Sequence, residues 1–127
     1  MPTFKSSVSI EQPPEAVFDF LKDLRHVPRF VDQVRAVEPL GDEQVRIRAE
    51  AGGSEVVTEG TFRVHEGHRR RIEWDLDIDD GYRGWLEVDP EGEVCSVTVE
   101  VHTAGEAELD DRLDRVLFAL KAAAEAL

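Results

Sequence analysis

The stretch that decides the fold is VSIEQPPEAVFDFLKD, residues 8–23. Its first residues, Val8 and Ile10, alternate with polar residues, which is typical of a half-buried strand. Two prolines then end the strand, and a proline suits the first turn of a helix because its missing N–H needs no partner there. Apolar residues recur afterwards at helical spacing, at Val17, Phe18 and Leu21. The stretch predicts a strand over residues 3–10 and a helix over residues 14–23.

Downstream of this start, a second short helix is expected over residues 25–33, broken by Pro28. Apolar and polar residues then alternate in segments separated by turn sequences, which predicts hairpin-linked strands. The expected strands are 34–40, 43–49, 55–65, 70–79, 82–88 and 95–102, with turns at Gly52-Gly53, Glu66-Gly67, Asp80-Gly81 and Pro90-Glu91-Gly92. An apolar stripe from Leu109 to Leu127 predicts a last helix over residues 106–127.

These elements predict an α+β fold in one domain of 127 residues. A curved antiparallel sheet of about seven strands would wrap around the C-terminal helix, with two short helices after the first strand. The last helix is about 28 Å long at 1.5 Å per residue, so we expect it to lie along the concave face of the whole sheet. A curled sheet closed by one helix need not pack solid, and a ligand pocket is expected between them.

The composition restricts the partners. The formal net charge is −13, from 28 acidic and 15 basic residues, and such a field repels nucleic-acid phosphates. The single cysteine, Cys95, allows no internal disulfide, and no apolar run approaches a membrane span or a signal peptide. We therefore expect no nucleic-acid partner, no membrane span and a cytoplasmic location.

The candidate site is the set of residues expected to face the cup. Trp74 and Tyr82 combine an apolar body with one polar group, which suits them to orient a ligand. Arg70 lies near a strand end and could meet an acidic ligand group, and Thr58 is a polar residue on an inward face. The predicted ligand-binding residues are Phe30, Ile47, Val56, Thr58, Phe62, Arg70, Ile72, Trp74, Leu76, Tyr82, Leu86, Val99, Leu113 and Leu117.

Motifs for other chemistries do not emerge from the sequence. The histidines have no metal-ligand spacing, and Asp75–Gly81 departs from the calcium-loop pattern. Neither a nucleophile elbow nor a phosphate loop is present. Cys95 lies among inward valines and is interpreted as a small core residue. The sequence predicts no catalytic residue, no metal and no cofactor.

Trp85 has the opposite parity to Leu86 and is predicted to face outward. An exposed tryptophan can mark a dimer or protein contact. The alternative is that neighbouring side chains such as Arg83 cover the indole.

Two segments carry a resemblance to a known family. Residues 17–31, VFDFLKDLRHVPRFV, combine an aromatic-rich helix, an acid and Pro-x-Phe, and the strand pair 86–92 and 96–99 follows the same group's penultimate hairpin. The chain resembles the START-like, or Bet v 1-like (SRPBCC), superfamily, in its polyketide cyclase and coenzyme Q-binding branch. The resemblance implies a helix-grip fold and covers nearly the whole chain. Members bind apolar or amphipathic small molecules, and some catalyse cyclisation or dehydration or act on protein partners.

The leading hypothesis is a non-catalytic binding or carrier module for a small hydrophobic or amphipathic molecule. A first alternative is a cyclase or dehydratase, which would need convergent polar groups deep in the cup. A second is a protein-interaction module with Trp85 as its anchor, as in the ribosome-associated toxins that this branch resembles.

Overall fold

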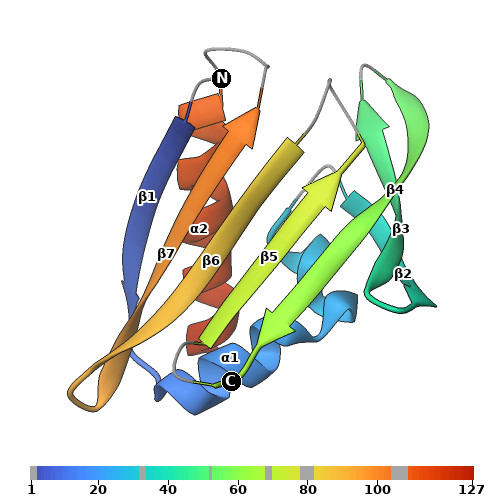
Figure 1. Cartoon of the computed structure of the whole chain (residues 1–127). Coiled ribbons are helices and arrows are strands. Elements are labelled where there is room, and N and C mark those ends of the chain that lie inside the picture. Colours follow the sequence, from blue (N-terminus) through green and yellow to red (C-terminus); the bar gives the residue numbers. More distant parts are fainter. Residues whose placement is uncertain (1–2, 32–33, 52, 68–69, 78–81, 104–108) are drawn as a thin grey trace.

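The computed structural model describes residues 3–31, 34–51, 53–67, 70–77, 82–103 and 109–127 (Figure 1). Its elements are β1 (Thr3–Ile10), α1 (Pro14–Lys22), η1 (Leu24–Arg29), β2 (Val34–Gly41), β3 (Gln44–Ala51), β4 (Ser54–His65), β5 (Arg70–Leu76), β6 (Tyr82–Glu91), β7 (Val94–Thr103) and α2 (Leu109–Glu125). The predicted helix-grip α+β fold is confirmed.

The strands form one seven-stranded antiparallel sheet in the order β1-β7-β6-β5-β4-β3-β2. Successive strands from β2 to β7 are neighbours, as the predicted hairpins require. The first strand, β1, pairs with β7, so the first and last strands of the chain are neighbours and β1 forms one edge of the sheet. The predicted turn at Asp80-Gly81 lies outside the described residues.

The N-terminal segment folds as its sequence predicts. Pro14 opens α1 at its first turn, and Val17, Phe18 and Leu21 are buried. Phe20 is buried as well, because its ring stacks on His26 with ring centroids 4.3 Å apart. This contact joins α1 to η1 and closes one end of the concave side (Figure 1).

Two proline expectations were wrong. Pro28 lies inside η1, a six-residue 3₁₀ helix, and does not break it. A 3₁₀ helix this short has few N–H groups that need partners, so one missing donor is tolerated. Pro90 belongs to β6 and not to a turn, because it lies beyond Val88, the last β6 residue that pairs with β5. On its other side Pro90 is opposite Cys95 of β7, and the chain reverses at Gly92, whose φ is 68°.

Helix α2 covers one half of the concave side rather than the whole of it. Its buried stripe is Leu113, Leu117, Leu120 and Ala124. The helix packs against β1 and η1, and Figure 1 shows it behind β1, β7 and β6. Its C-terminal end is tied to the end of β1, where Lys121 Nζ donates to the Ser9 carbonyl at 2.6 Å. Ile72 of β5 belongs to the same buried core as the α2 stripe, whereas Phe62 of β4 is only partly buried against that core.

Candidate functional site

The inner surface of β4, β5 and β6 brings the central predicted residues together. Phe62 of β4 lies directly opposite Trp74 of β5, and Trp74 lies opposite Gly84 of β6. The next row of the sheet toward α1 holds Ile72, opposite Leu86. Because side chains alternate between faces, these residues share the face that α1 and α2 cover in part.

Burial divides this inner surface into two parts. On β7 the inward side chains are fully packed, with Val97 at 0% and Val99 at 4% relative exposure. On β3 to β5 burial is mixed: Val45, Ala49, Thr58 and Ile72 are buried, whereas the half-buried inward side chains are Ile47, Val56, Phe62, Trp74 and Leu76. Phe62 and Trp74 pack against the core without being enclosed by it. An apolar surface that the fold itself does not cover is the main feature of the candidate site.

The structure places thirteen of the predicted residues' side chains and leaves one undescribed. The buried ones are Phe30, Thr58, Ile72, Leu86, Val99, Leu113 and Leu117. The half-buried ones are Ile47, Val56, Phe62, Arg70, Trp74 and Leu76. The side chain of Tyr82 lies outside the described part. A ligand role for these residues remains a prediction.

Two of the predicted polar residues already have partners within the protein. The Thr58 hydroxyl donates to the Asp77 carbonyl at 2.8 Å, so it closes the end of β5. Arg70 pairs with Glu15 of α1, with 3.2 Å between guanidinium nitrogen and carboxylate oxygen. The guanidinium therefore lies at the end of the sheet that α1 closes (Figure 1).

Trp74 differs from both. Its Nε1 atom is buried and has no hydrogen-bond partner, and it is the one such side-chain atom found among the described residues. An indole N–H can only donate, and leaving a buried donor unpaired costs about 1–3 kcal/mol.

The indole of Trp74 packs directly against Gly84, a contact that sequence reasoning missed. A Cβ at Gly84 would lie 2.7 Å from Trp74 Cζ2 and 2.8 Å from Trp74 Cε2. The ring therefore occupies the space that any other residue's side chain would need. The strand alignment alone could have suggested it, since a glycine opposite a large aromatic marks close approach.

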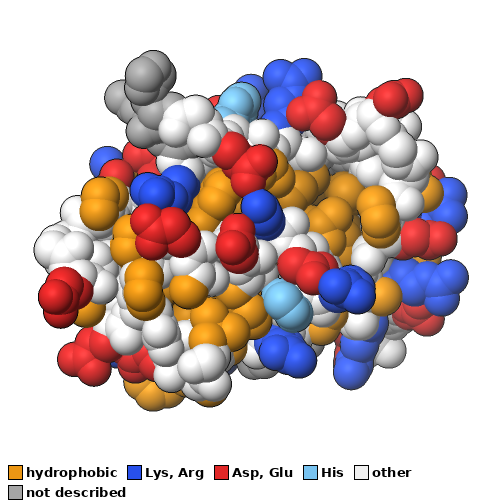
Figure 2. Space-filling view, turned by 90° about the horizontal axis from the view of Figure 1, so that it is seen from below, with side chains coloured by type: hydrophobic (Ala, Val, Ile, Leu, Met, Phe, Trp, Pro, Cys, Tyr) orange, Lys and Arg blue, Asp and Glu red, His pale blue; other side chains and the backbone are white. Residues whose placement is uncertain are grey.

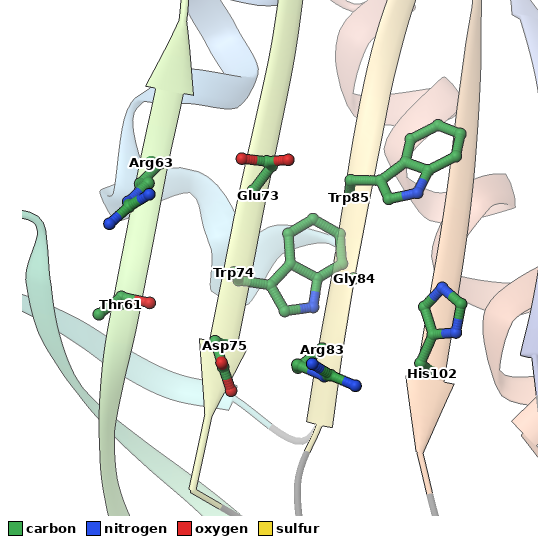
Figure 3. Close-up of a pocket in the computed structure, with 9 residues that line it drawn as sticks. All are labelled: Thr61, Arg63, Glu73, Trp74, Asp75, Arg83, Gly84, Trp85 and His102. Atoms are coloured by element: carbon green, nitrogen blue, oxygen red, sulfur yellow. The ribbon is translucent and has the colours of Figure 1, made fainter. Parts of the chain in front are cut away.

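The outer face of the sheet carries an open groove of about 480 Å³ (Figure 3). It is lined by Thr61, Arg63, Glu73, Trp74, Asp75, Arg83, Gly84, Trp85 and His102. Figure 3 shows these residues on β4 to β7, with the helices on the far side of the sheet. Acidic and basic groups are mixed along the groove, and of its lining residues sequence reasoning had singled out Trp74 for the ligand site and Trp85 for a protein contact.

Trp85 lies on this outer face, as its parity predicted, but it is half-buried. Its Nε1 donates to Glu100 at 2.8 Å, and the Arg71 guanidinium lies 4.5 Å from the ring centroid. Lys5 covers the ring from a second side at 5.6 Å. The covering side chains are thus Arg71 and Lys5, and a protein contact through Trp85 remains a prediction.

Acid–base pairs stabilise the same face. His102 Nε2 lies 3.0 Å from Glu100 Oε2, and this contact, together with the Trp85 N–H, holds the pKa of Glu100 below its ordinary value. Likewise His65, and then Arg71, lower the pKa of Glu73. Carboxylates with lowered pKa values stay ionised and are satisfied by the protein, which is the pattern of a structural network.

Reactive groups are sparse in the described part. Cys95 is fully buried, and burial raises the pKa of its thiol, which disfavours the nucleophilic thiolate. His26 Nδ1 lies 2.7 Å from the Phe20 carbonyl and is engaged in the α1–η1 contact. Among the described residues, no group of three or more His, Cys, Asp or Glu is arranged to hold a metal ion.

The surface mixes charged and apolar side chains. Figure 2 shows acidic and basic groups interspersed with hydrophobic side chains that reach the surface. Among large hydrophobic residues, Phe118 on α2 is 76% exposed and Val57 on β4 is 54% exposed. No helix in the described ranges is long and apolar enough to cross a membrane.

Comparisons with known proteins agree with this architecture. A family model described as polyketide cyclase / dehydrase and lipid transport matches residues 1–126. No curated protein matches the sequence.

Several solved structures share the fold at low identity. A START superfamily protein from Mycobacterium smegmatis superposes with a TM-score of 0.80 at 14% identity, covering 98% of this chain and 97% of that one. DR_A0006 from Deinococcus radiodurans gives 0.78 at 23% identity, covering 98% of both chains. The Zhui aromatase/cyclase from Streptomyces sp. R1128 gives 0.77 at 15% identity, covering 98% and 93%. At such identities the likeness concerns the fold alone.

Proposed function

Because the chain belongs to the polyketide cyclase / dehydrase and lipid transport family, we propose that it binds a small hydrophobic or amphipathic molecule on the concave side of its sheet. The carrying observation is the set of inward apolar side chains that no element of the fold fully covers, centred on Phe62 and Trp74. A ligand that covered these side chains would bury apolar area, worth about 25 cal/mol per Å².

Burial supports this location over the outer groove. The inner surface is apolar and lies beside the packed core, which is the usual composition of a small-molecule site. The outer groove is open and lined largely by charged side chains, of which Glu73 pairs with Arg71 and His102 with Glu100. An apolar molecule would displace less water and meet more charge there.

Among the side chains that the structure describes, the polar groups of the inner face favour binding without chemistry. A cyclase or dehydratase needs positioned groups that exchange protons with the substrate. Of the polar side chains predicted for the inner face, Thr58 and Arg70 are committed to partners within the protein. Trp74 can donate a hydrogen bond but cannot act as a base.

The test uses the two tryptophans as position-specific reporters, since the chain has only two. The variant Trp85→Phe retains Trp74 alone, and Trp74→Phe retains Trp85 alone. Both are titrated with Nile red, a neutral apolar dye. We expect quenching or a shift of tryptophan emission in Trp85→Phe and none in Trp74→Phe.

Other outcomes would contradict the proposal. A response that follows Trp85 would move binding to the outer groove. Nile red fluorescence itself reports binding to the unmodified protein and to both variants. If none of them binds the dye, the proposed function is wrong.

A further inference from the structure

The unpaired donor of Trp74 bears on the chemistry of the ligand, given the proposed function. Its Nε1 is buried with no partner in the protein, whereas the indole of Trp85 has one. Buried polar atoms in proteins are nearly always paired, by protein, water or ligand. The donor is therefore a polar position for which the described protein supplies no acceptor.

The indole is held in place, so it cannot turn to find an acceptor elsewhere. Its ring fills the space over Gly84, and Phe62 lies opposite on the other neighbouring strand. In addition, the ring packs against the buried core. The direction of the N–H bond is thus set by the protein before any ligand binds.

The surroundings favour an uncharged acceptor. Among the described strand residues that share a face with Trp74, the one cation is Arg70, and it is paired with Glu15. Arg70 is also four positions along the strand, about 13 Å away. A carboxylate or phosphate placed at Trp74 would lose hydration without gaining a positive partner from these strands, in a protein of net charge −13.

We infer that the ligand is a neutral molecule with a hydrogen-bond acceptor, such as a carbonyl oxygen, that accepts from Trp74 Nε1 while its apolar body covers Phe62 and neighbouring side chains. Trp74 is then the group that separates acceptor-bearing ligands from plain hydrocarbons and from anions. This inference rests on the proposed function, since it assigns a role within the same site.

The experiment compares three probes of one shape: 9-fluorenone with a carbonyl, fluorene without it, and fluorene-9-carboxylate with a charge. Affinities are measured by calorimetry on the unmodified protein, on Trp74→Phe and on Trp85→Phe. We expect the unmodified protein and Trp85→Phe to prefer fluorenone over fluorene by about five- to tenfold, the usual worth of one hydrogen bond. Trp74→Phe keeps an aromatic ring without the donor, and we expect it to bind the two neutral probes equally.

A second readout does not depend on any variant. In ¹⁵N-labelled protein the two indole N–H resonances are followed by NMR during each titration. Fluorenone is expected to shift the Trp74 resonance downfield more than fluorene does, while the Trp85 resonance, already bonded to Glu100, stays in place and serves as the internal reference.

The outcomes separate the two proposals. If none of the three probes binds, the proposed function fails. If fluorene binds as tightly as fluorenone and the Trp74 resonance responds equally to both, the site stands and the inference is wrong. Tightest binding of the carboxylate would equally overturn it.

Discussion

Two tryptophans on neighbouring strands, Trp74 on β5 and Trp85 on β6, face opposite sides of one sheet. They differ in hydrogen bonding and in the side chains that cover them. On the outer face, the Trp85 indole donates to Glu100 and is covered by Arg71 and Lys5. On the inner face, the Trp74 indole is seated on Gly84 with its donor unpaired.

On the outer face, the indole of Trp85 is covered and hydrogen-bonded by other residues of the protein. On the inner face, the indole of Trp74 is neither fully covered nor hydrogen-bonded by the described residues. On the outer face, long charged side chains cover the Trp85 ring with their apolar stems. Aromatic side chains on the inner face can be shielded from water only by another element of the fold or by a ligand. Helix α2 packs against β1, whereas Trp74 and Phe62 on the neighbouring part of the inner face stay half-buried.

The largest expected effect concerns the closed half. Leu117→Ala removes a side chain that is 3% exposed in the contact between α2 and the sheet. We expect the free energy of unfolding to fall by about 2–5 kcal/mol, measured by urea denaturation. Its neighbour Phe118 is 76% exposed, so Phe118→Ala should change the free energy by no more than about 0.5 kcal/mol. Equal effects of the two substitutions would mean that α2 is not docked by this stripe.

The next effect concerns the contact between the Trp74 ring and Gly84. Gly84→Ala would place a methyl group 2.7 Å from the indole and 2.7 Å from the Glu100 carbonyl. We expect a loss of about 1–3 kcal/mol in the free energy of unfolding, because the ring must move. In the Trp85→Phe background, the emission of Trp74 should shift as well.

The matched control for this substitution is Gly67→Ala. A Cβ at Gly67 meets no atom within 4 Å, and the backbone there does not require glycine. This variant should leave both stability and Trp74 emission unchanged. An unperturbed Gly84→Ala protein would contradict the placement of the indole.

A smaller effect separates the two indoles by acid titration. The pKa of Glu100 is lowered from 4.5 by its hydrogen bonds with His102 and Trp85. Its stabilising contribution is therefore fully present above pH 4.5 and is lost as the pH falls through the lowered value. In Trp74→Phe, we expect Trp85 emission to be constant down to pH 4.5 and to change below it.

The control is the same titration in Trp74→Phe with Glu100→Gln, where this transition should be absent. Circular dichroism recorded in parallel separates a local change from acid unfolding. An identical transition with glutamine at this position would show that another group titrates.

The last prediction is that the protein does not bind nucleic acid. The net charge of −13 opposes phosphate contacts on either face. We expect no retention on immobilised RNA at neutral pH and physiological salt. Salt-sensitive retention would contradict this and would direct attention to the arginines that line the outer groove.

Much of the fold could be predicted from the sequence because it depends on local signals. The two prolines after Ile10 and the alternation in each strand predicted the element order, and hairpin-length turns predicted the antiparallel neighbours. The errors came where local signals depend on their surroundings. Pro90 continues a strand because it pairs with Cys95 of β7, and no turn signal encodes how far a neighbouring strand extends.

For the two tryptophans the sequence by itself determined which side of the sheet each one faces, because successive side chains on a strand point to opposite faces. Only the tertiary structure decided which indole has a partner. Glu100 lies fifteen residues from Trp85 and reaches its Nε1 only because β6 and β7 pair in that register. Likewise α2 covers the half of the concave side next to β1 and leaves the inner face around Trp74 half-open. Parity is a property of one strand, whereas coverage and hydrogen-bond partners depend on how distant elements pack.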